Sequence, residues 1–410
     1  MRTGTTTCAV VGGGPAGMVL GLLLARAGVD VTVFEKHRDF LRDFRGDTVH
    51  PATLTLLDDL GLYDRFMALP HSEIHRSQFT IGGRTVTVVD FGRLRVPHPM
   101  LALVPQWDLL DLLADAAKDE PSFTVKMQTE VTGLLGDGGT VTGVRFDGPH
   151  GPGEMRADLT VACDGRTSLV RRDAGMKLRE FPVPFDVAWF RLDAIGDIRY
   201  QLTPRFADGM AMVLIPREGY FQAGAILPKG GAPQLRARGL DAFRAQVAEL
   251  VPEGSVDTID SWDDVKVLDV RLDRLDRWHR PGLLCIGDAA HAMSPIGGVG
   301  INLAVGDAVA AAAALAEPLS AGRVSEHDLA KVQRRRQPPA VITQSVQRIV
   351  HTALRRVLVS GTRPQPPELA ERVVSALLSR VPALSVVPAY FIGVGVRPER
   401  APAFARRNGE

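Results

Sequence analysis

The stretch TTTCAVVGGGPAGMVLGLLLARAGVDVTVFEK, residues 5–36, decides the fold class. Its short apolar run Thr6–Val11 predicts a strand, and the glycines that follow predict a turn. Apolar residues continue at helical spacing over Pro15–Ala27, Gly28 ends this helix, and Val29–Glu35 predicts a second strand. A strand–helix–strand unit of this kind indicates an α/β fold with a parallel sheet.

The turn in this unit has the spacing of a dinucleotide-binding motif. The letters GGGPAG at 12–17 fit G-x-G-x-x-G between a strand and a helix. The first glycine allows the tight turn, the second lets a pyrophosphate approach the backbone, and the third lets helix and strand pack closely. Glu35 can accept hydrogen bonds from ribose hydroxyls and disfavours a 2′-phosphate, so the unit suits the adenosine of NAD or FAD. The candidate cofactor-binding residues here are Gly12, Gly14, Pro15, Ala16, Gly17, Glu35 and Lys36.

Composition and charge place the chain among ordinary globular proteins. With 410 residues it is long enough for two domains or for one interwoven domain. It is 45% hydrophobic and 23% charged, and its formal net charge of +1 does not suggest a nucleic-acid partner. Three cysteines, each in a short apolar run, favour buried side chains in a reducing compartment over a disulfide framework, so we expect a cytoplasmic protein.

We expect no membrane-spanning segment. The apolar N-terminus resembles a signal peptide, but the glycines at 12–17 interrupt it and a strand follows. The stretch 373–396 comes closest to a span. It is interrupted by Arg380, Pro382 and Pro388. For the C-terminal residues, an amphipathic role at a membrane surface is the alternative to packing on the first domain.

The rest of the chain predicts an interleaved organisation. Segments of nucleotide-binding character occur at the start, near residue 160 and near residue 285, and a mainly β segment with one helix, about 239–251, lies between the last two. A hairpin is expected to turn at Gly82-Gly83. The expected boundaries are 1–75, 100–180 and 275–330 for a discontinuous first domain, 76–99 and 181–274 for an inserted β-sheet domain, and 331–410 for a helical C-terminal segment.

The second motif is ACDGRTSLVRR at 162–172. Asp164 follows a strand and precedes Gly165, which places a carboxylate where a turn can meet the polar edge of a cofactor. Ser168 can cap the following helix, and Arg171 can hold a phosphate or an aspartate. A capped turn with solvated arginines explains the same residues without a cofactor.

The third motif is CIGDAAHAMSPIGGVGIN at 285–302. Asp288 can accept a hydrogen bond from a ribose or ribityl hydroxyl, Pro295 fixes the chain, and the glycines bring bare backbone close to a flat ligand. Asn302 opens a helix whose N-terminus can stabilise negative charge. His291 lies near Asp288, but two residues do not make a metal site, so we expect no metal and interpret His291 as a structural neighbour of Asp288. The candidate cofactor-binding residues here are Asp288, Pro295, Gly298, Gly300, Ile301 and Asn302.

In this order, the three motifs resemble those of the flavoprotein monooxygenases of the para-hydroxybenzoate hydroxylase type, over about residues 6–340. The resemblance implies a Rossmann-like FAD-binding domain with an inserted, mostly antiparallel β-sheet substrate domain and C-terminal helices. It implies noncovalent FAD, with NADPH or NADH as co-substrate. It also implies insertion of one oxygen atom of O₂, through a flavin C4a-hydroperoxide, into a small organic substrate of aromatic or polyketide-like type.

The resemblance assigns further residues. Arg45, in the loop FRGDTVHP, matches an arginine that reaches the flavin side, and Val131 matches a position whose backbone meets adenine. Gln106 stands at a helix start where the family often has an arginine, so the charge of that FAD contact is missing here. Residues 298–302 match the backbone cradle of the isoalloxazine ring, and Asp164 and Arg171 belong to a motif shared by FAD and nicotinamide contacts.

The candidate pocket residues are His50, Asp47, Trp189, Arg191, Gln222 and Pro295. His50 and Asp47 lie on the Arg45 loop, and each is either a neighbour of flavin or substrate or a local structural residue. Alternation puts Trp189 and Arg191 on one face of a strand, and either face of that sheet can be the pocket wall. No residue stands out as the catalytic base.

Two other functions fit the same motifs. A reductase or dehydrogenase on the same scaffold, for instance one that acts on isoprenoid chains, would use the same FAD site. A protein that holds FAD without turnover would also keep it, although the intact glycines and aspartates disfavour this. The expected partners are a small-molecule substrate, O₂ and NAD(P)H, and we expect a monomer or a homodimer.

Overall fold

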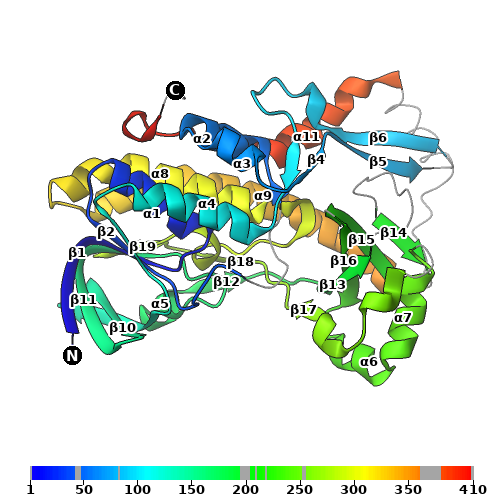
Figure 1. Cartoon of the computed structure of the whole chain (residues 1–410), viewed down its shortest axis with the longest axis horizontal. Helices are drawn as coiled ribbons and strands as arrows, with labels where there is room; N and C mark the ends of the chain where they lie inside the picture. Colours follow the sequence, from blue (N-terminus) through cyan, green and yellow to red (C-terminus); the bar gives the residue numbers. More distant parts are fainter. Residues whose placement is uncertain are drawn as a thin grey trace.

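The computed structural model describes residues 2–41, 48–81, 84–193, 204–207, 210–217, 219–251, 255–360 and 380–407. The chain forms a large α/β part around an eight-stranded sheet and a second part around a five-stranded sheet (Figure 1). The long helix α9, Glu326–Ser360, joins them, because it packs on β19 of the first sheet and its Leu354 packs in the core beside the second sheet.

The eight-stranded sheet confirms the predicted α/β class. Its order is β19-β20-β11-β1-β2-β8, and β10 and β9 extend it from β11. β1 pairs in parallel with β11 and β2, and β11 pairs in parallel with β20. The three sequence motifs follow β1, β11 and β20, so these neighbouring parallel strands bring all three motifs to one edge of the sheet. The strands are β1 Arg2–Val11, β2 Val31–Phe34, β8 Phe123–Lys126, β9 Glu130–Asp137, β10 Thr140–Gly148, β11 Gly151–Ala162, β19 His279–Arg280 and β20 Leu283–Cys285.

Helices α1, α4 and α8 lie together on one side of this sheet (Figure 1). α1 and α8 pack against each other, and their apolar side chains form the main core together with those of β1 and β2. This burial explains why both helices are apolar nearly all round. The helices of this part are α1 Pro15–Arg26, α2 Pro51–Asp59, α3 Tyr63–Met67, α4 Gln106–Lys118, α5 Leu169–Asp173 and α8 Gly300–Ser320.

One helix among the described residues, 296–320, is long and apolar enough to cross a bilayer by length and composition. However, 67% of its most apolar window is buried inside the fold, and the alanines and valines of α8 belong to the main core. The stretch suggested by the sequence, 373–396, contributes only a short apolar helix within its described part, 383–393.

The second part is an antiparallel sheet of order β14-β15-β16-β13-β17. The sequence predicts one helix here, and the described residues of this part contain a further helix, α6, before the predicted one. These helices cover one face of the sheet, where Phe190, Leu214 and Phe243 share a buried cluster. The elements are β13 Phe185–Asp193, β14 Pro204–Ala207, β15 Met210–Arg217, β16 Tyr220–Pro228, β17 Lys266–Leu268, α6 Ala232–Ala237 and α7 Leu240–Ala248.

Short strands and the C-terminal helix α11, Val386–Gly393, connect the two parts. The predicted hairpin is present, and its turn residues Gly82 and Gly83 lie outside the described residues. α11 packs on this hairpin, where Ala389, Val89 and Phe91 share a buried cluster. The remaining strands are β3 Thr48–Val49, β4 Ser72–Ile74, β5 Arg76–Ile81, β6 Arg84–Asp90, β7 Leu101–Leu103, β12 Leu178–Glu180 and β18 Asp273–Leu275.

The three cysteines are free thiols. Cys8 on β1 and Cys285 on β20 are fully buried, whereas Cys163, just after β11, is half-buried. Burial raises the pKa of each thiol, so these side chains act as small apolar groups rather than as reactive thiolates.

Candidate FAD site

The first glycine motif is fixed by contacts with neighbouring backbone. Gly12 has a φ of +103°, and a Cβ there would lie 2.5 Å from the Cys163 carbonyl oxygen. A Cβ on Gly17 would lie 2.0 Å from the Gly12 carbonyl oxygen. Any side chain at either position would push the turn away from β11 or from helix α1, so the roles expected from the spacing match the observed packing.

The start of helix α1 is open to an anion. Gly14 occupies the N-cap position, no side chain caps the helix, and its first turn has no acidic residue. Among the described residues, no atom lies within 4 Å of a Cβ built on Gly14. Free N–H groups at a helix N-terminus beside open space suit a pyrophosphate, because both the donors and the helix dipole favour negative charge.

Glu35 lies at the end of β2 beside this turn. It is 2% exposed, and its carboxylate accepts hydrogen bonds from the Gly13 N–H and the His37 N–H, each at 3.0 Å. The His37 ring Nδ1 lies 2.6 Å from Oε1. These contacts aim the carboxylate at the glycine turn, where the sequence predicts the ribose.

Asp164 has an unused acceptor. Its Oδ2 accepts from the Val170 N–H at 3.1 Å, whereas its buried Oδ1 has no hydrogen-bond partner among the described residues. Burial raises the pKa of this carboxyl. A buried polar atom without a partner is costly in a folded protein, so Oδ1 is suited to a ligand hydroxyl or amide.

Arg171 is a brace between two motifs rather than a ligand-facing group. It is 4% exposed, and its guanidinium donates to the carbonyls of Ala289 at 3.1 Å and Arg166 at 2.8 Å. Asp273 lies 3.8 Å from the guanidinium, so an aspartate is its ionic partner, one of the two alternatives that the sequence left open. Ser168 caps α5, as predicted, by accepting from the Arg171 N–H at 2.9 Å.

Asp288 and His291 do not form a pair. Asp288 is half-buried and lies 3.6 Å from the Arg166 guanidinium. His291 is buried, and its Nε2 contacts Asp307 on α8 at 2.6 Å. The expectation that His291 is structural therefore agrees with the geometry, and its hydrogen-bond partner is Asp307 rather than its chain neighbour Asp288.

The loop before α8 carries the expected glycine backbone. Gly297 and Gly298 have φ values of +81° and +63°, and Pro295 precedes them. No side chain caps α8, so its first N–H groups are free, and residues 300–302 lie in this first turn. The Asn302 Oδ1 accepts from the Thr53 hydroxyl at 2.9 Å, which fixes the side chain on the α2 side of the turn.

His50 is held between two carbonyl oxygens. Nε2 lies 2.9 Å from the Gly298 oxygen and Nδ1 lies 2.8 Å from the Ile392 oxygen. Burial lowers the pKa of His50 to about 4, although both carbonyls favour the charged form, so the neutral ring donates to only one of the two oxygens. The side chain is fully buried and does not cap α2. His50 is thus a neighbour of the predicted flavin loop through its backbone, with neither nitrogen left for a substrate.

Other predicted cofactor residues are placed as follows. Arg45 and Asp47 lie outside the described residues. Gln106 is half-buried in the first turn of α4, and Val131 is buried near the start of β9. Lys36 is exposed just after β2. Their contacts with FAD stay predictions.

Strand pairing decides the face of the predicted pocket residues. Gln222 is paired with Arg191, and Gly224 with Trp189, so all of them share one face of the five-stranded sheet. A Cβ on Gly224 would lie 2.7 Å from the Trp189 ring, which shows that the indole lies flat across β16. Arg191 is exposed and stacks on Tyr220, with 4.3 Å between its guanidinium carbon and the ring centre.

The sequence analysis missed several buried charges, and two of them are Arg217 and Asp307. Arg217 is 5% exposed and donates to the Gln222 side chain at 3.1 Å. Asp307 is fully buried in α8. A charged residue inside an otherwise apolar helix stretch, LAVGDAVAAAAALA, is a signal that would have found Asp307. Within the described residues, no group of three or more His, Cys, Asp or Glu side chains is arranged to hold a metal ion.

A family model described as an FAD binding domain matches residues 5–345. The chain is also 36% identical over 377 residues to 6-methylpretetramide 4-monooxygenase of Streptomyces rimosus, and this match covers 90% of the chain and 89% of that protein. The chain belongs to the FAD-dependent monooxygenases of the para-hydroxybenzoate hydroxylase type.

This monooxygenase is also similar to longer proteins and to solved structures. It is 29% identical to the 12-dehydrotetracycline 5-monooxygenase/anhydrotetracycline 6-monooxygenase of Streptomyces rimosus subsp. rimosus, with 73% of this chain and 60% of that protein covered. The p-nitrophenol 4-monooxygenase PnpA from Pseudomonas putida DLL-E4 has a TM-score of 0.78 at 22% identity, with 97% of this chain and all of that chain covered. That likeness shows a shared fold.

The residues of this monooxygenase fit FAD. The uncapped α1 N-terminus at Gly14 suits its pyrophosphate, the free Oδ1 of Asp164 suits a polar group, and the positive-φ glycines before α8 leave bare backbone for a flat ring. Of the two cofactors that the first motif alone allowed, NAD and FAD, membership of the family selects FAD.

Proposed function

We propose that this monooxygenase hydroxylates an aromatic or polyketide-like substrate, that NADPH or NADH reduces its FAD, and that a flavin C4a-hydroperoxide delivers the oxygen atom. When bound, reduced FAD supplies the electrons that activate O₂. The observation that carries the substrate class is the half-buried apolar face of the five-stranded sheet. The 36% identical relative acts, by its name, on 6-methylpretetramide, which supports the same class.

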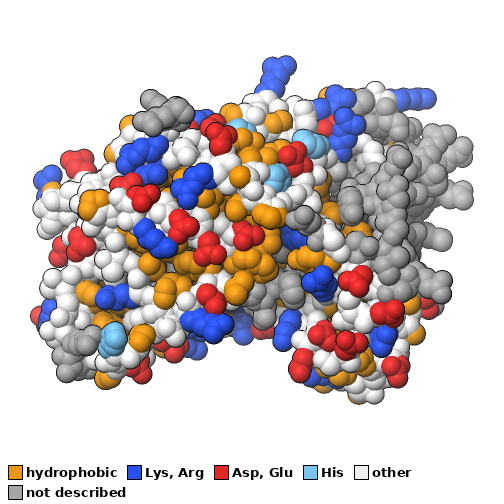
Figure 2. Space-filling view, in the orientation of Figure 1, with side chains coloured by type: hydrophobic (Ala, Val, Ile, Leu, Met, Phe, Trp, Pro, Cys, Tyr) orange, Lys and Arg blue, Asp and Glu red, His pale blue; other side chains and the backbone are white. Residues whose placement is uncertain are grey.

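This face is a wall of partly uncovered apolar side chains. Trp189, Val213, Ile215 and Ile226 are half-buried on it, whereas the opposite face is packed on α6 and α7. Ile296, in the predicted flavin loop, packs in the cluster that contains Trp189 and Ile226. The wall therefore adjoins that loop. Hydrophobic side chains also gather on the surface between the two parts of the molecule, above a notch (Figure 2).

Polar groups on the same face favour an aromatic substrate with oxygen substituents. The indole Nε1 of Trp189 is buried and has no hydrogen-bond partner among the described residues, so it can donate to a substrate oxygen. Arg217 and Gln222 add a buried positive charge and an amide to this face. A cation near the wall lowers the pKa of a phenol, and the phenolate is the more reactive form for hydroxylation.

We also propose a cytoplasmic location. The three free cysteines suit a reducing compartment. Fractionation of the source cells, with the holoprotein followed by flavin absorbance, tests this part of the proposal. Recovery in an extracellular or membrane fraction would contradict it.

The main test is an oxygen-labelling experiment with the purified holoprotein. The probes are 6-methylpretetramide and a panel of simpler phenols, each supplied with NADPH or NADH and ¹⁸O₂. We expect one labelled oxygen atom in each product molecule and no product without O₂. Product formation under strict anoxia would identify a dehydrogenase instead.

The substitution Trp189→Phe sharpens this test. It keeps an aromatic ring on the wall and removes the Nε1 donor, so we expect KM to rise about tenfold, the worth of one hydrogen bond to a substrate. NAD(P)H oxidation without substrate should stay unchanged, because the phenyl ring keeps the packing beside the predicted flavin loop and only the Nε1 donor is lost. An unchanged KM would show that the Trp189 Nε1 does not bind the substrate.

A further inference from the structure

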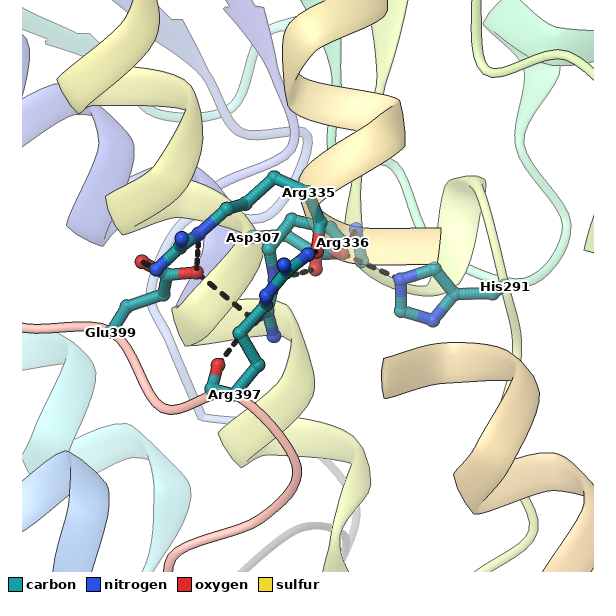
Figure 3. A network of polar contacts seen from close by, with 7 residues as sticks. His291, Asp307, Arg335, Arg336, Arg397 and Glu399 are labelled. Carbon is teal, nitrogen blue, oxygen red and sulfur yellow. Dashed lines mark hydrogen bonds and ion pairs between the residues drawn. The ribbon is translucent and has the colours of Figure 1, made fainter. Parts of the chain in front are cut away.

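Asp307, in the middle of α8, binds three donors in the core. Its Oδ2 accepts from the Gly287 N–H at 3.0 Å and contacts His291 Nε2 at 2.6 Å, and its Oδ1 accepts from Arg336 Nε at 2.9 Å. The side chain is fully buried. Burial alone would raise the pKa of Asp307, but His291 and Arg336 hold it below its usual range, so the carboxylate is ionised. Figure 3 shows Asp307 between His291 and Arg336.

Arg336, on α9, extends this network to the C-terminal segment. Its Nη1 donates to the Arg397 carbonyl at 3.0 Å and to Glu399 Oε1 at 3.2 Å, and Arg335 also holds Glu399 (Figure 3). A Cβ on Gly306 would lie 2.6 Å from Arg336 Nη2, so the glycine lets the guanidinium lie against α8. The negative charges of Asp307 and Glu399 thus share one buried cation.

The proton on His291 is fixed by this geometry. At 2.6 Å from a carboxylate oxygen, Nε2 must carry a hydrogen, because two lone pairs would repel each other at that distance. The other nitrogen, Nδ1, is buried without a hydrogen-bond partner among the described residues, and Trp278 packs on the ring. His291 therefore serves as one donor to Asp307, which keeps the carboxylate turned toward Gly287.

We propose that Asp307 is a positioning residue for FAD. Gly287 has a φ of +58° and directly precedes Asp288, the predicted contact to the FAD chain. By accepting the Gly287 N–H, Asp307 fixes the turn that presents Asp288, and through Arg336 it makes residues 397–399 part of that support. The proposal concerns FAD binding alone, so it holds or fails independently of the substrate and of the oxygen chemistry.

The test is the substitution Asp307→Asn, measured by FAD affinity. The amide has one acceptor oxygen, so either the Gly287 N–H or the Arg336 Nε–H faces an NH₂ group. We expect the Kd of FAD, from fluorescence quenching on titration of the apoprotein, to rise about tenfold, which corresponds to about 1.4 kcal/mol. Because the stabilisation by bound FAD rises with the logarithm of its affinity, the gap in Tm between holoprotein and apoprotein should also narrow.

The matched control is Leu315→Ala, in the core-facing surface of the same helix. It should lower the Tm of both forms and leave the Kd of FAD within twofold of the wild type. If Asp307→Asn behaves like this control, Asp307 supports only the fold and the proposal is overturned.

If Asp307→Asn does not fold, Arg336→Lys decides the question. Lysine keeps the positive charge but lacks the forked donors that reach Asp307 and Glu399 together. A rise of at least threefold in the Kd of FAD supports the proposal, since the contact of Arg336 that leads to the Gly287 turn is the one to Asp307. An unchanged Kd overturns it.

Discussion

The two glycine-rich turns of the FAD site are supported in different ways. In the turn at 12–17, neighbouring backbone limits the space for side chains. A Cβ on Gly12 or Gly17 would collide with a carbonyl oxygen, at 2.5 and 2.0 Å respectively. At 287–298 the backbone is held by side chains from distant segments, with Asp307 at Gly287 and His50 at Gly298. Hence the first turn tolerates no side chain at Gly12 or Gly17, whereas the second responds by degrees and depends on the C-terminal residues.

The largest effect should come from Gly17→Ala. Its Cβ would collide with the Gly12 carbonyl, and neither helix α1 nor β1 can move without disturbing the main core. We expect a loss of at least about 3 kcal/mol in the free energy of unfolding and no FAD in the purified protein. Urea unfolding of the apoprotein and flavin absorbance after purification measure the two outcomes.

Gly14→Ala is the matched control within the same turn. The added methyl group meets no atom, and the φ of −77° suits alanine, so the free energy of unfolding of the apoprotein should stay within about 0.5 kcal/mol of the wild type. The Kd of FAD should nevertheless rise about tenfold, because the methyl group stands where a pyrophosphate approaches the backbone. Normal FAD binding would show that this turn does not hold the pyrophosphate.

The next effect is acid sensitivity from His50 at the second turn. The folded-state pKa is about 4, against 6.5 for the free side chain, so the unfolded chain binds more protons between these pH values. Stability should therefore fall as the pH drops from 6.5 to 4, by at most about 3 kcal/mol from this residue. His50→Gln does not titrate, and urea unfolding across this pH range should show a smaller loss.

His351→Gln is the control for His50. Burial lowers the pKa of His351 to about 4 as well, but its Nε2 contacts the Ser294 hydroxyl rather than the Gly298 loop. The substitution His351→Gln should reduce the loss of stability between pH 6.5 and 4 by a similar amount and leave the flavin absorption spectrum unchanged. His50→Gln, in contrast, should shift that spectrum. If His50→Gln loses as much stability between pH 6.5 and 4 as the wild type, His50 is protonated in the folded protein.

The smallest effect is expected from Gly298→Ala. Its φ of +63° costs an alanine about 1 kcal/mol, and the Cβ would lie 3.1 Å from the Thr48 hydroxyl oxygen and 3.5 Å from His50 Nε2. We expect a loss of about 1–2 kcal/mol in the free energy of unfolding. Gly297→Ala carries only the conformational cost, because its nearest neighbour is Val299 at 3.5 Å. Equal losses in the two variants would show that Thr48 and His50 do not constrain the loop.

The sequence predicted where the cofactor motifs would meet. Each motif directly follows a strand, and strands that alternate with helices form parallel sheets whose carboxyl ends share one edge. The structure confirms that β1, β11 and β20 are neighbours. The roles of individual residues toward FAD remain predictions, and Arg45 and Asp47 lie outside the described residues.

The partners of buried polar groups could not be predicted in this way. His291 was placed beside Asp288 because they are close in the chain, but it pairs with Asp307. Arg171 was assigned to a phosphate or an aspartate, and only the packing showed that it braces the Ala289 and Arg166 carbonyls. The side of the five-stranded sheet that is proposed to face the pocket likewise depended on which face α6 and α7 cover.

The sequence by itself determined the α/β class, the order of the three FAD motifs and the glycines that those motifs need. These features depend on backbone geometry and on apolar periodicity, which residue types within a few positions encode. Only the tertiary structure decided that Asp307, Arg336 and the C-terminal residues support the second turn. Their contacts join elements far apart in the chain, and a buried charge finds its partner only once those elements are packed together.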